Sequence, residues 1–242
     1  TEIDTAVDYD RHLPHDPLDQ AGHVNTIFFV AVSANLAFTV LEATYAYIAD
    51  SVSLLGDAGH NLGDVLGLLL AWGAAYLAGK KTSRMYSYGY RRTTILAAII
   101  NALVLVFAAS LIAFESLEKF IQPTPIQEIP VIVVASIGIV VNTGAAWLFI
   151  KGSKKDLSLK AAFLHLAYDA LISVGVVVTA TAILYTGWMW LDPLAAVMIV
   201  VIITWGAWGL LRDSVNLILD AVPQGIDRTS VENYLHSIDG VT

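Results

Sequence analysis

Residues 54–64 read LLGDAGHNLGD and place Asp57, His60 and Asp64 inside a run that is otherwise apolar. The run continues on both sides for long enough to cross the roughly 30 Å hydrocarbon core of a bilayer as one helix. An ionisable side chain at that depth costs roughly 3 kcal/mol on insertion scales, so it marks a functional site by default. We therefore expect this stretch to be the centre of a membrane-spanning helix that also carries the chemistry of the protein.

The composition of the whole chain agrees with a membrane protein. Hydrophobic residues make up 57% of the 242 residues and charged residues 14%, whereas a soluble domain carries roughly 25% charged residues. The mean hydropathy is +0.67. The net charge is −8 and no broad basic face is present, so nucleic acid is not an expected partner. Cysteine is absent, so any transition-metal site must use histidine and carboxylates.

Six stretches each offer about 20 mostly apolar residues, the length that a transmembrane helix needs. They are Asn25–Ile48, Ser51–Leu77, Thr93–Phe120, Ile129–Ile150, Leu157–Tyr185 and Leu191–Leu219. The fold we predict is an all-α, six-helix transmembrane bundle over residues 25–222. The lipid bilayer is therefore its first expected partner.

Lysine and arginine gather in two of the connections between these stretches. They are Lys80, Lys81, Arg84, Arg91 and Arg92 after the second stretch, and Lys151, Lys154, Lys155 and Lys160 around the connection after the fourth. Because basic connections stay on the cytoplasmic side, we expect both of these, and with them both termini, in the cytoplasm.

The two terminal segments differ from the apolar region between them. Residues 1–24 are polar and acidic, without a basic start, so we expect a flexible cytoplasmic arm and no cleavable signal peptide. Residues 223–242 contain Thr229 and Glu232 at capping-box spacing, followed by one apolar helical face. We expect this tail to be the start of a cytoplasmic C-terminal domain that is truncated or missing.

A second pair of intramembrane ligands, His165 and Asp169, repeats the His-x-x-x-Asp spacing of His60 and Asp64. Residues four apart share one helical face, about 6 Å apart along the axis. His60 and Asp64 lie about 14 and 20 Å below the outer end of their helix, and His165 and Asp169 about 12 and 18 Å from the inner end of theirs. Because the two helices are antiparallel, His60 should lie level with Asp169 and Asp64 with His165.

Two imidazoles and two carboxylates at one depth suit tetrahedral Zn²⁺. The alternative is a buried hydrogen-bonded network without metal, and ferrous, cobalt and cadmium ions also fit the ligand set. Gly59, Gly63 and Gly67 repeat every four residues beside the ligands. This stripe is either a generic packing face or the close approach that brings helix 157–185 within ligand distance.

Other polar residues of the apolar stretches have less specific interpretations. Glu42, Asp57 and Glu115 could line an outward path for the ion, or they could have ordinary interface positions. Asp192 and Pro193 have the order expected at a helix start, with the acid as cap and proline in the first turn.

Four features act together: SVSLLGDAGH at 51–60 continuing to Asp64, YSYG at 86–89 before Arg91 and Arg92, the His165–Asp169 pair, and Asp192-Pro193. With them the sequence resembles the cation diffusion facilitator family of metal–proton antiporters over the whole membrane region. Histidine and aspartate in both motifs look like the zinc-transporting branch.

The resemblance implies a homodimer that exports Zn²⁺, with Cd²⁺ as a second substrate, from the cytoplasm in exchange for protons. It also implies a multi-pass protein of the cell (inner) membrane of a bacterium. The loop 151–156 lacks the histidines of many zinc exporters, and the N-terminal histidines either collect metal instead or belong to a solvated acidic tail. A membrane metal sensor that binds zinc without moving it remains the alternative. We do not expect an enzyme, because His-Glu-x-x-His is absent and four protein ligands leave no position for a reactive water.

Overall fold

The computed structural model describes residues 17–79, 92–153, 157–222 and 227–238, and within these residues it is all-helical. The helices are α1 (Pro17–Ile48), α2 (Val52–Ala78), α3 (Thr93–Ile121), α4 (Glu128–Ser153), α5 (Leu157–Thr186), α6 (Leu191–Ile218) and α7 (Arg228–His236). Helices α2 to α6 begin and end within three residues of the predicted stretches. Helix α1 begins at Pro17, eight residues before the predicted start at Asn25, so residues 17–24 of the expected flexible arm are helical.

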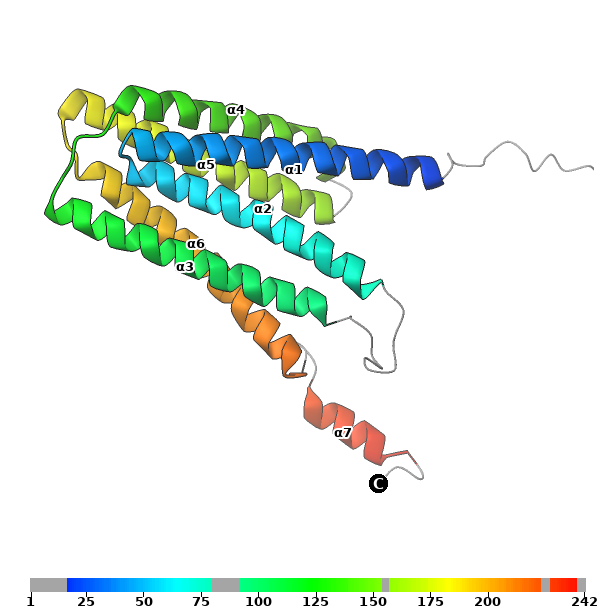
Figure 1. Ribbon diagram of the computed structural model, residues 1–242. Helices are drawn as coiled ribbons and strands as arrows, with labels where there is room; N and C mark the ends of the chain where they lie inside the picture. The colour runs from blue at the N-terminus through cyan, green and yellow to red at the C-terminus, as the bar shows by residue number, and fades with distance from the viewer. Residues whose placement is uncertain (1–16, 80–91, 154–156, 223–226, 239–242) are drawn as a thin grey trace, which may run out of the picture.

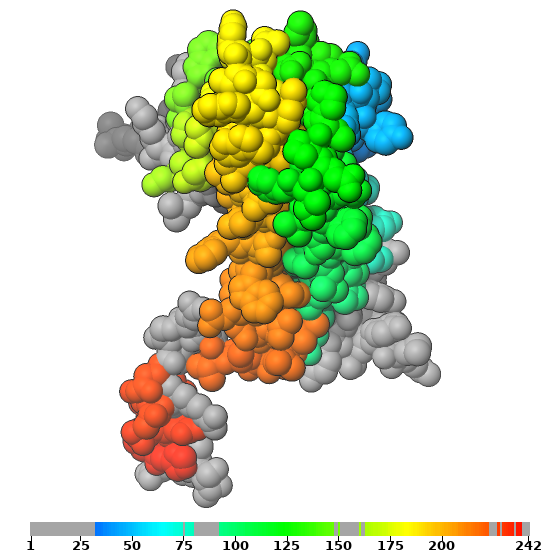
Figure 2. Space-filling view, turned by 90° about the vertical axis from the view of Figure 1, so that its left-hand side faces the viewer, coloured from blue at the N-terminus to red at the C-terminus, as the bar shows by residue number. Residues whose placement is uncertain are grey.

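Helices α1 to α6 form an up-and-down bundle (Figure 1). The short connections α1–α2, α3–α4 and α5–α6 lie together at one end, which we call the closed end. The start of α1 and the end of α6 lie at the opposite end, the terminal end, and α7 extends beyond it. Helices α3 and α6 run side by side along one face (Figure 2), and α4 packs mainly on α5.

Five helices are long and apolar enough to cross a membrane by length and composition. Their apolar segments are Val52–Ala78, Thr93–Ile121, Glu128–Trp147, Phe163–Thr186 and Leu191–Ile218. Helix α1 is not among the five, and its side chains are described only from Val32 onward. The all-helical, multi-pass membrane fold is therefore confirmed, while the sixth span and the side of the termini stay predictions.

The hydrophobic core lies in the closed half of the bundle, and all six long helices contribute to it. Its buried members include Ala46, Leu54, Ala109, Val131, Val176 and Ile199. The bundle is less tightly packed beside the middle of α2 and α5, where the ionisable residues line a cavity.

The carboxylate of Asp192 holds the first turn of α2, although the residue belongs to α6. Its Oδ2 accepts the Val52 backbone N–H at 2.8 Å, and its Oδ1 accepts the Ser51 and Ser53 hydroxyls at 2.7 and 2.6 Å. The Asp192 side chain is buried, and these donors satisfy it in place of water. The prediction that Asp192 caps its own helix is therefore wrong: the N-cap position of α6 is Trp190, with no side-chain cap.

A second polar contact fixes the turn between α1 and α2 at the closed end. The buried Lys119 of α3 donates to the backbone oxygen of Asp50 at 2.6 Å and to its Oδ1 at 2.7 Å, while Thr124 donates to Oδ2 at 2.6 Å. Asp50 has a positive φ of 53°, so the contacts hold a strained turn. Partial burial raises the pKa of Asp50, but the hydrogen bonds from Lys119 and Thr124 lower it by more, so the net pKa lies below the ordinary 3.8.

The glycine stripe of α2 packs against α3. A Cβ added at Gly59, Gly63 or Gly67 would lie 2.9, 2.1 or 2.9 Å from an atom of Ile112, Leu105 or Asn101, respectively. The interpretation that this stripe brings α5 close to α2 is therefore wrong, and the packing-face interpretation holds. The stripe positions the site indirectly, because it sets how far α3 stands from the ligand-bearing helix.

The short helix α7 is capped by Asp227. The backbone N–H and the hydroxyl of Ser230 donate to Asp227 Oδ2 at 3.2 and 2.5 Å. The predicted capping box began two residues later at Thr229, and this detail is corrected.

Replacing Asp192 by alanine should destabilise the protein by about 2–4 kcal/mol, because several buried donors at the start of α2 lose their acceptor. Thermal unfolding in detergent measures the effect, with Asp213→Ala, an exposed acid of the same helix, as the matched control. Equal melting temperatures for the two variants would contradict the capping role.

Replacing Gly63 by alanine should cost about 1–3 kcal/mol, because the new methyl group overlaps the Leu105 side chain. The double variant Gly63→Ala with Leu105→Ala should recover part of that loss, since space is returned where it was taken. Unfolding curves of the single and double variants test this, and strictly additive losses would rule out the contact.

Candidate metal site

Four side chains from two helices meet in the middle of the bundle. Helix α2 contributes His60 and Asp64, and α5 contributes His165 and Asp169. His60 Nε2 lies 3.2 Å from Asp169 Oδ1 and 3.8 Å from Asp64 Oδ2. His165 Nε2 lies 3.4 Å from Asp64 Oδ2 and 3.7 Å from Asp169 Oδ2. The contacts close a ring in which imidazoles and carboxylates alternate.

The local sequence explains this ring. Each pair is spaced four residues apart, so both members lie on one face of their helix. Helices α2 and α5 run in opposite directions in the bundle (Figure 1). His60 of α2 therefore meets Asp169 near the end of the α5 motif, and Asp64 meets His165 near its beginning.

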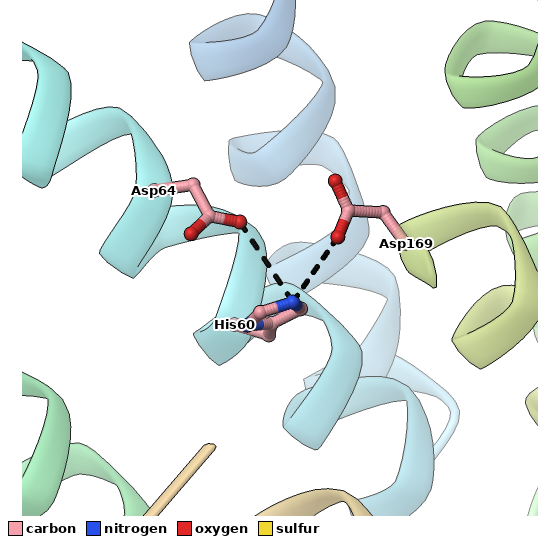
Figure 3. A group of neighbouring side chains, drawn as sticks. All are labelled: His60, Asp64 and Asp169. Carbon is pink, nitrogen blue, oxygen red and sulfur yellow. Dashed lines mark hydrogen bonds and ion pairs between the residues drawn. The ribbon is translucent and has the colours of Figure 1, made fainter. Parts of the chain in front are cut away.

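The ring has nearly the dimensions of a tetrahedral zinc site. With bonds of 2.0–2.2 Å, neighbouring ligand atoms of such a site lie roughly 3.3–3.6 Å apart. Ligand atoms of His60, Asp64 and Asp169 all lie within 4.8 Å of one another, and Figure 3 shows the imidazole of His60 between the two carboxylates. His165 is outside this tight group of three, and its ring centroid lies 6.2 Å from that of His60. An inward movement of His165 would complete a four-ligand site.

The four ligands differ in exposure. The Asp169 side chain is 5% exposed and those of His60 and Asp64 are 16% and 21% exposed, whereas His165 is 49% exposed. All four line one cavity of about 670 Å³, whose other walls are mostly apolar side chains of α5 and α6. The cavity gives an ion a route to the ring, and His165 is the ligand that it would meet first.

The charge of the ring suits a divalent cation. Two carboxylates with two neutral imidazoles carry −2, and among the residues with described side chains no lysine or arginine forms an ion pair with them. Asp64 Oδ2 is buried without a hydrogen-bond partner, which is costly unless another group, such as a cation, satisfies it. The donor set therefore fits a metal ion.

The residues expected along an outer path lie elsewhere. Neither Glu42 nor Asp57 lines the cavity; both are fully buried between helices. Glu115 is half-buried on α3 and is also absent from the cavity wall. Sequence reasoning missed Ser173, which lies four residues after Asp169, and gave no role to Asn61, four residues after Asp57. Extending the four-residue polar spacing in each helix would have found both.

A comparison with known families agrees with the all-helical membrane fold. The cation efflux transmembrane domain, as a family model, matches residues 28–219. The chain belongs to the cation efflux, or cation diffusion facilitator, family and is a multi-pass integral membrane protein of the cell membrane.

Three bacterial relatives illustrate the family. The chain is 32% identical over 206 residues to the "Cadmium, cobalt and zinc/H(+)-K(+) antiporter" of Bacillus subtilis, covering 84% of this chain and 66% of the relative. It is 34% identical over 217 residues to the "Zinc transporter ZitB" of Escherichia coli, covering 89% and 67%. It is 32% identical over 212 residues to the "Cation efflux system protein CzcD" of an Alcaligenes species, covering 88% and 67%. The chain thus spans about two thirds of the length of these relatives.

The ring geometry predicts unequal contributions to metal binding. Replacing Asp169 by alanine should weaken Zn²⁺ binding by more than the roughly 10–100-fold loss that follows when a residue hydrogen-bonded to a metal ligand is changed, because this buried carboxylate contacts both imidazoles. His165→Ala should cost less, on the order of tenfold, because His165 stands outside the tight group. Calorimetric titration of purified protein measures both, with Asp213→Ala as control. Equal losses for the two variants would contradict a site in which Asp169 is the central ligand.

Proposed function

We propose that this protein is a zinc–proton antiporter that exports Zn²⁺, and also Cd²⁺, from the cytoplasm. The observation that carries the proposal is the closed ring of His60, Asp64, His165 and Asp169 between α2 and α5, with edges of 3.2 to 3.8 Å. The names of the relatives, which include zinc, cadmium, cobalt and cation efflux, agree with this substrate class.

Zinc is the ion that this donor set suits best. Two nitrogen and two oxygen ligands in a tetrahedral arrangement match its usual coordination, and the chain has no cysteine to favour softer ions. Affinity alone does not separate Zn²⁺ from Co²⁺ or Cd²⁺, so these ions are the natural competitors. The cavity leaves the ring accessible, which supports transport of the ion rather than storage.

The mechanism is alternating access coupled to protons. Zn²⁺ binds ionised carboxylate and neutral imidazole, so protons and zinc compete for the same ligand atoms. The deprotonated ring takes zinc from the cytoplasm, the helices re-pack, and the ring opens to the outside. Protons entering there displace the ion, and the protonated ring returns inward. Proton entry down its gradient drives metal exit.

The topology and assembly belong to the same proposal. Both termini are cytoplasmic, as the basic connections require, although most of those basic residues lie outside the described ranges. One of those that are described, Arg92, donates to both oxygens of Asp220 at 3.0 and 2.9 Å and so ties α3 to the end of α6. Two chains associate as a homodimer, which rests on the family alone.

Reconstituted protein should move Zn²⁺ across the membrane of proteoliposomes, and an imposed pH gradient should change the rate. Asp64→Ala and His165→Ala should each lower flux at least tenfold while the proteins still fold, because each removes a ligand of the transported ion. Flux of Zn²⁺, Cd²⁺, Co²⁺ and Mn²⁺ is measured with an internal fluorescent indicator, and Asp213→Ala serves as the matched control.

Each outcome separates the proposal from its alternative. Tight zinc binding without flux would identify a membrane metal sensor. Flux that ignores the pH gradient would leave a zinc transporter but remove the antiport mechanism. Full activity in both ligand variants would remove the ring from transport altogether.

A further inference from the structure

A second cluster of ionisable groups lies beside the metal ring and is not used by it. Glu42 of α1 and Asp57 of α2 are both fully buried. Asn61 Nδ2 donates to Glu42 Oε2 at 2.8 Å, and the Ser173 hydroxyl of α5 donates to Asp57 Oδ2 at 2.8 Å. Each carboxyl therefore has one oxygen satisfied by a neutral donor.

The other two oxygens have no such donor. Glu42 Oε1 and Asp57 Oδ1 are buried without a hydrogen-bond partner. The two carboxyl groups are within hydrogen-bonding range of each other. Two carboxylates in contact inside a low-dielectric interior strongly disfavour a double negative charge when no metal ion is near, so one of them holds a proton in the metal-free protein. A single proton shared by the two carboxyl groups supplies the donor that this contact lacks.

Within the described part of the chain, no lysine or arginine side chain neutralises the pair. The groups that face the pair are Asn61 on α2, Ser173 on α5, and, at longer range, His60 and Asp169 of the ring. The ionisable residues of α4, Glu128 and Lys151, lie at its two ends. Among residues with described side chains, no lysine or arginine pairs with Glu42 or Asp57. The proton is therefore what allows this pair to be buried.

We propose that Glu42 and Asp57 form a proton-binding site separate from the metal ligands, which releases its proton when metal enters the ring and regains it when metal leaves. This rests on the proposed function, because it assigns part of the counter-transported proton to a specific place. The balance is simple. The O–H bond of the shared proton breaks, the pair goes from −1 to −2, and H⁺ leaves to water.

The position of the pair explains the coupling. Asp57 lies three residues before His60 on α2, and its hydrogen-bond partner Ser173 lies four residues after Asp169 on α5. The pair and the ring thus connect the same two helices about one turn apart. Asp57 interacts electrostatically with His60 and Asp169, so a divalent cation among the ligands disfavours a proton on the pair. Because Asn61 ties Glu42 to α2, the change in charge also reaches α1.

The same oxygens do not suit a metal cation. Hard cations such as Ca²⁺ need six to eight oxygen ligands, and the pair leaves only Glu42 Oε1 and Asp57 Oδ1 unpartnered. A proton needs only two oxygens. The chemistry therefore favours H⁺ over a monovalent or divalent metal ion as the occupant.

Infrared spectroscopy of the reconstituted full chain without metal tests the site directly. A protonated carboxyl has its own carbonyl-stretch band, which shifts in heavy water, and we expect this band at neutral pH. Glu42→Gln should lose it, and Glu42→Asp should retain it. Glu115→Gln, the same change in a half-buried acid of α3, should keep it. Loss of the band in the control variant as well, or its absence from the wild type, would overturn the proposal.

Zinc addition supplies the second readout. Zn²⁺ should bleach the band in the wild type, and the protons released per zinc bound should fall by about one in Glu42→Gln, with zinc still binding within a few fold. A band that persists in saturating Zn²⁺ would make the pair purely structural. A Glu42→Gln effect on K⁺ dependence with unchanged proton release would assign the site to K⁺ and overturn the proposal. Absence of zinc flux in the wild type removes the proposed function, whereas the metal-free band still decides whether the pair holds a proton.

Discussion

The carboxylate of Asp192 fixes where α2 begins, and the rest of the site depends on that register. It joins α6 to the backbone and hydroxyls of residues 51–53 through four hydrogen bonds. Within the next three turns α2 presents Asp57, His60 and Asp64. Since a shift of one residue turns a helix by about 100°, a different start would aim these side chains at lipid or at α3 instead of at α5. A buried charge of this kind is stable only when it is fully paired, which makes the start of α2 a fixed point.

The packing around this fixed point is asymmetric. A dense core fixes the site on one side, and a cavity leaves it accessible on the other. The closed half has a dense core to which all six long helices contribute, and Lys119 holds its α1–α2 turn. Further along α2, glycines let α3 approach closely on one side, while a cavity of about 670 Å³ opens on the side of α5 and α6. The ring lies at the boundary between these two regions. All four of its side chains line the cavity, but Asp169 is 5% exposed and His165 is 49% exposed.

The sequence predicted what depends on spacing along one helix and not what depends on contact between helices. Apolar length located α2 to α6 to within three residues, and the four-residue spacing in two antiparallel helices paired His60 with Asp169. The partners of Asp192 could not be predicted in this way, because the donors at residues 51–53 lie about 140 residues before it in the sequence. Local rules favoured a cap on its own helix instead. The prediction of which helix packs on the glycine stripe was wrong for the same reason. A small residue permits another helix to approach closely, but it does not determine which helix does so. Ser173 was overlooked because a single hydroxyl in an apolar helix is unremarkable until a buried carboxylate is found opposite it.

The two ionisable clusters are best understood together as one distribution of charge. With neutral imidazoles the ring carries −2, and the Glu42–Asp57 pair carries −1 when it shares one proton. A bound divalent ion would neutralise the ring, but it would not contact the Glu42–Asp57 pair. The pair would therefore respond to the ion only through long-range electrostatics. At the few ångströms that separate successive helical turns, such fields are strong in a low-dielectric interior. Protons that compete directly for the ligands and a proton that responds at a distance have different consequences. In the proposed mechanism, the first kind clears the ring for release. The second changes the bonding between α1 and α2 and so links the occupancy of the ring to the packing of these helices.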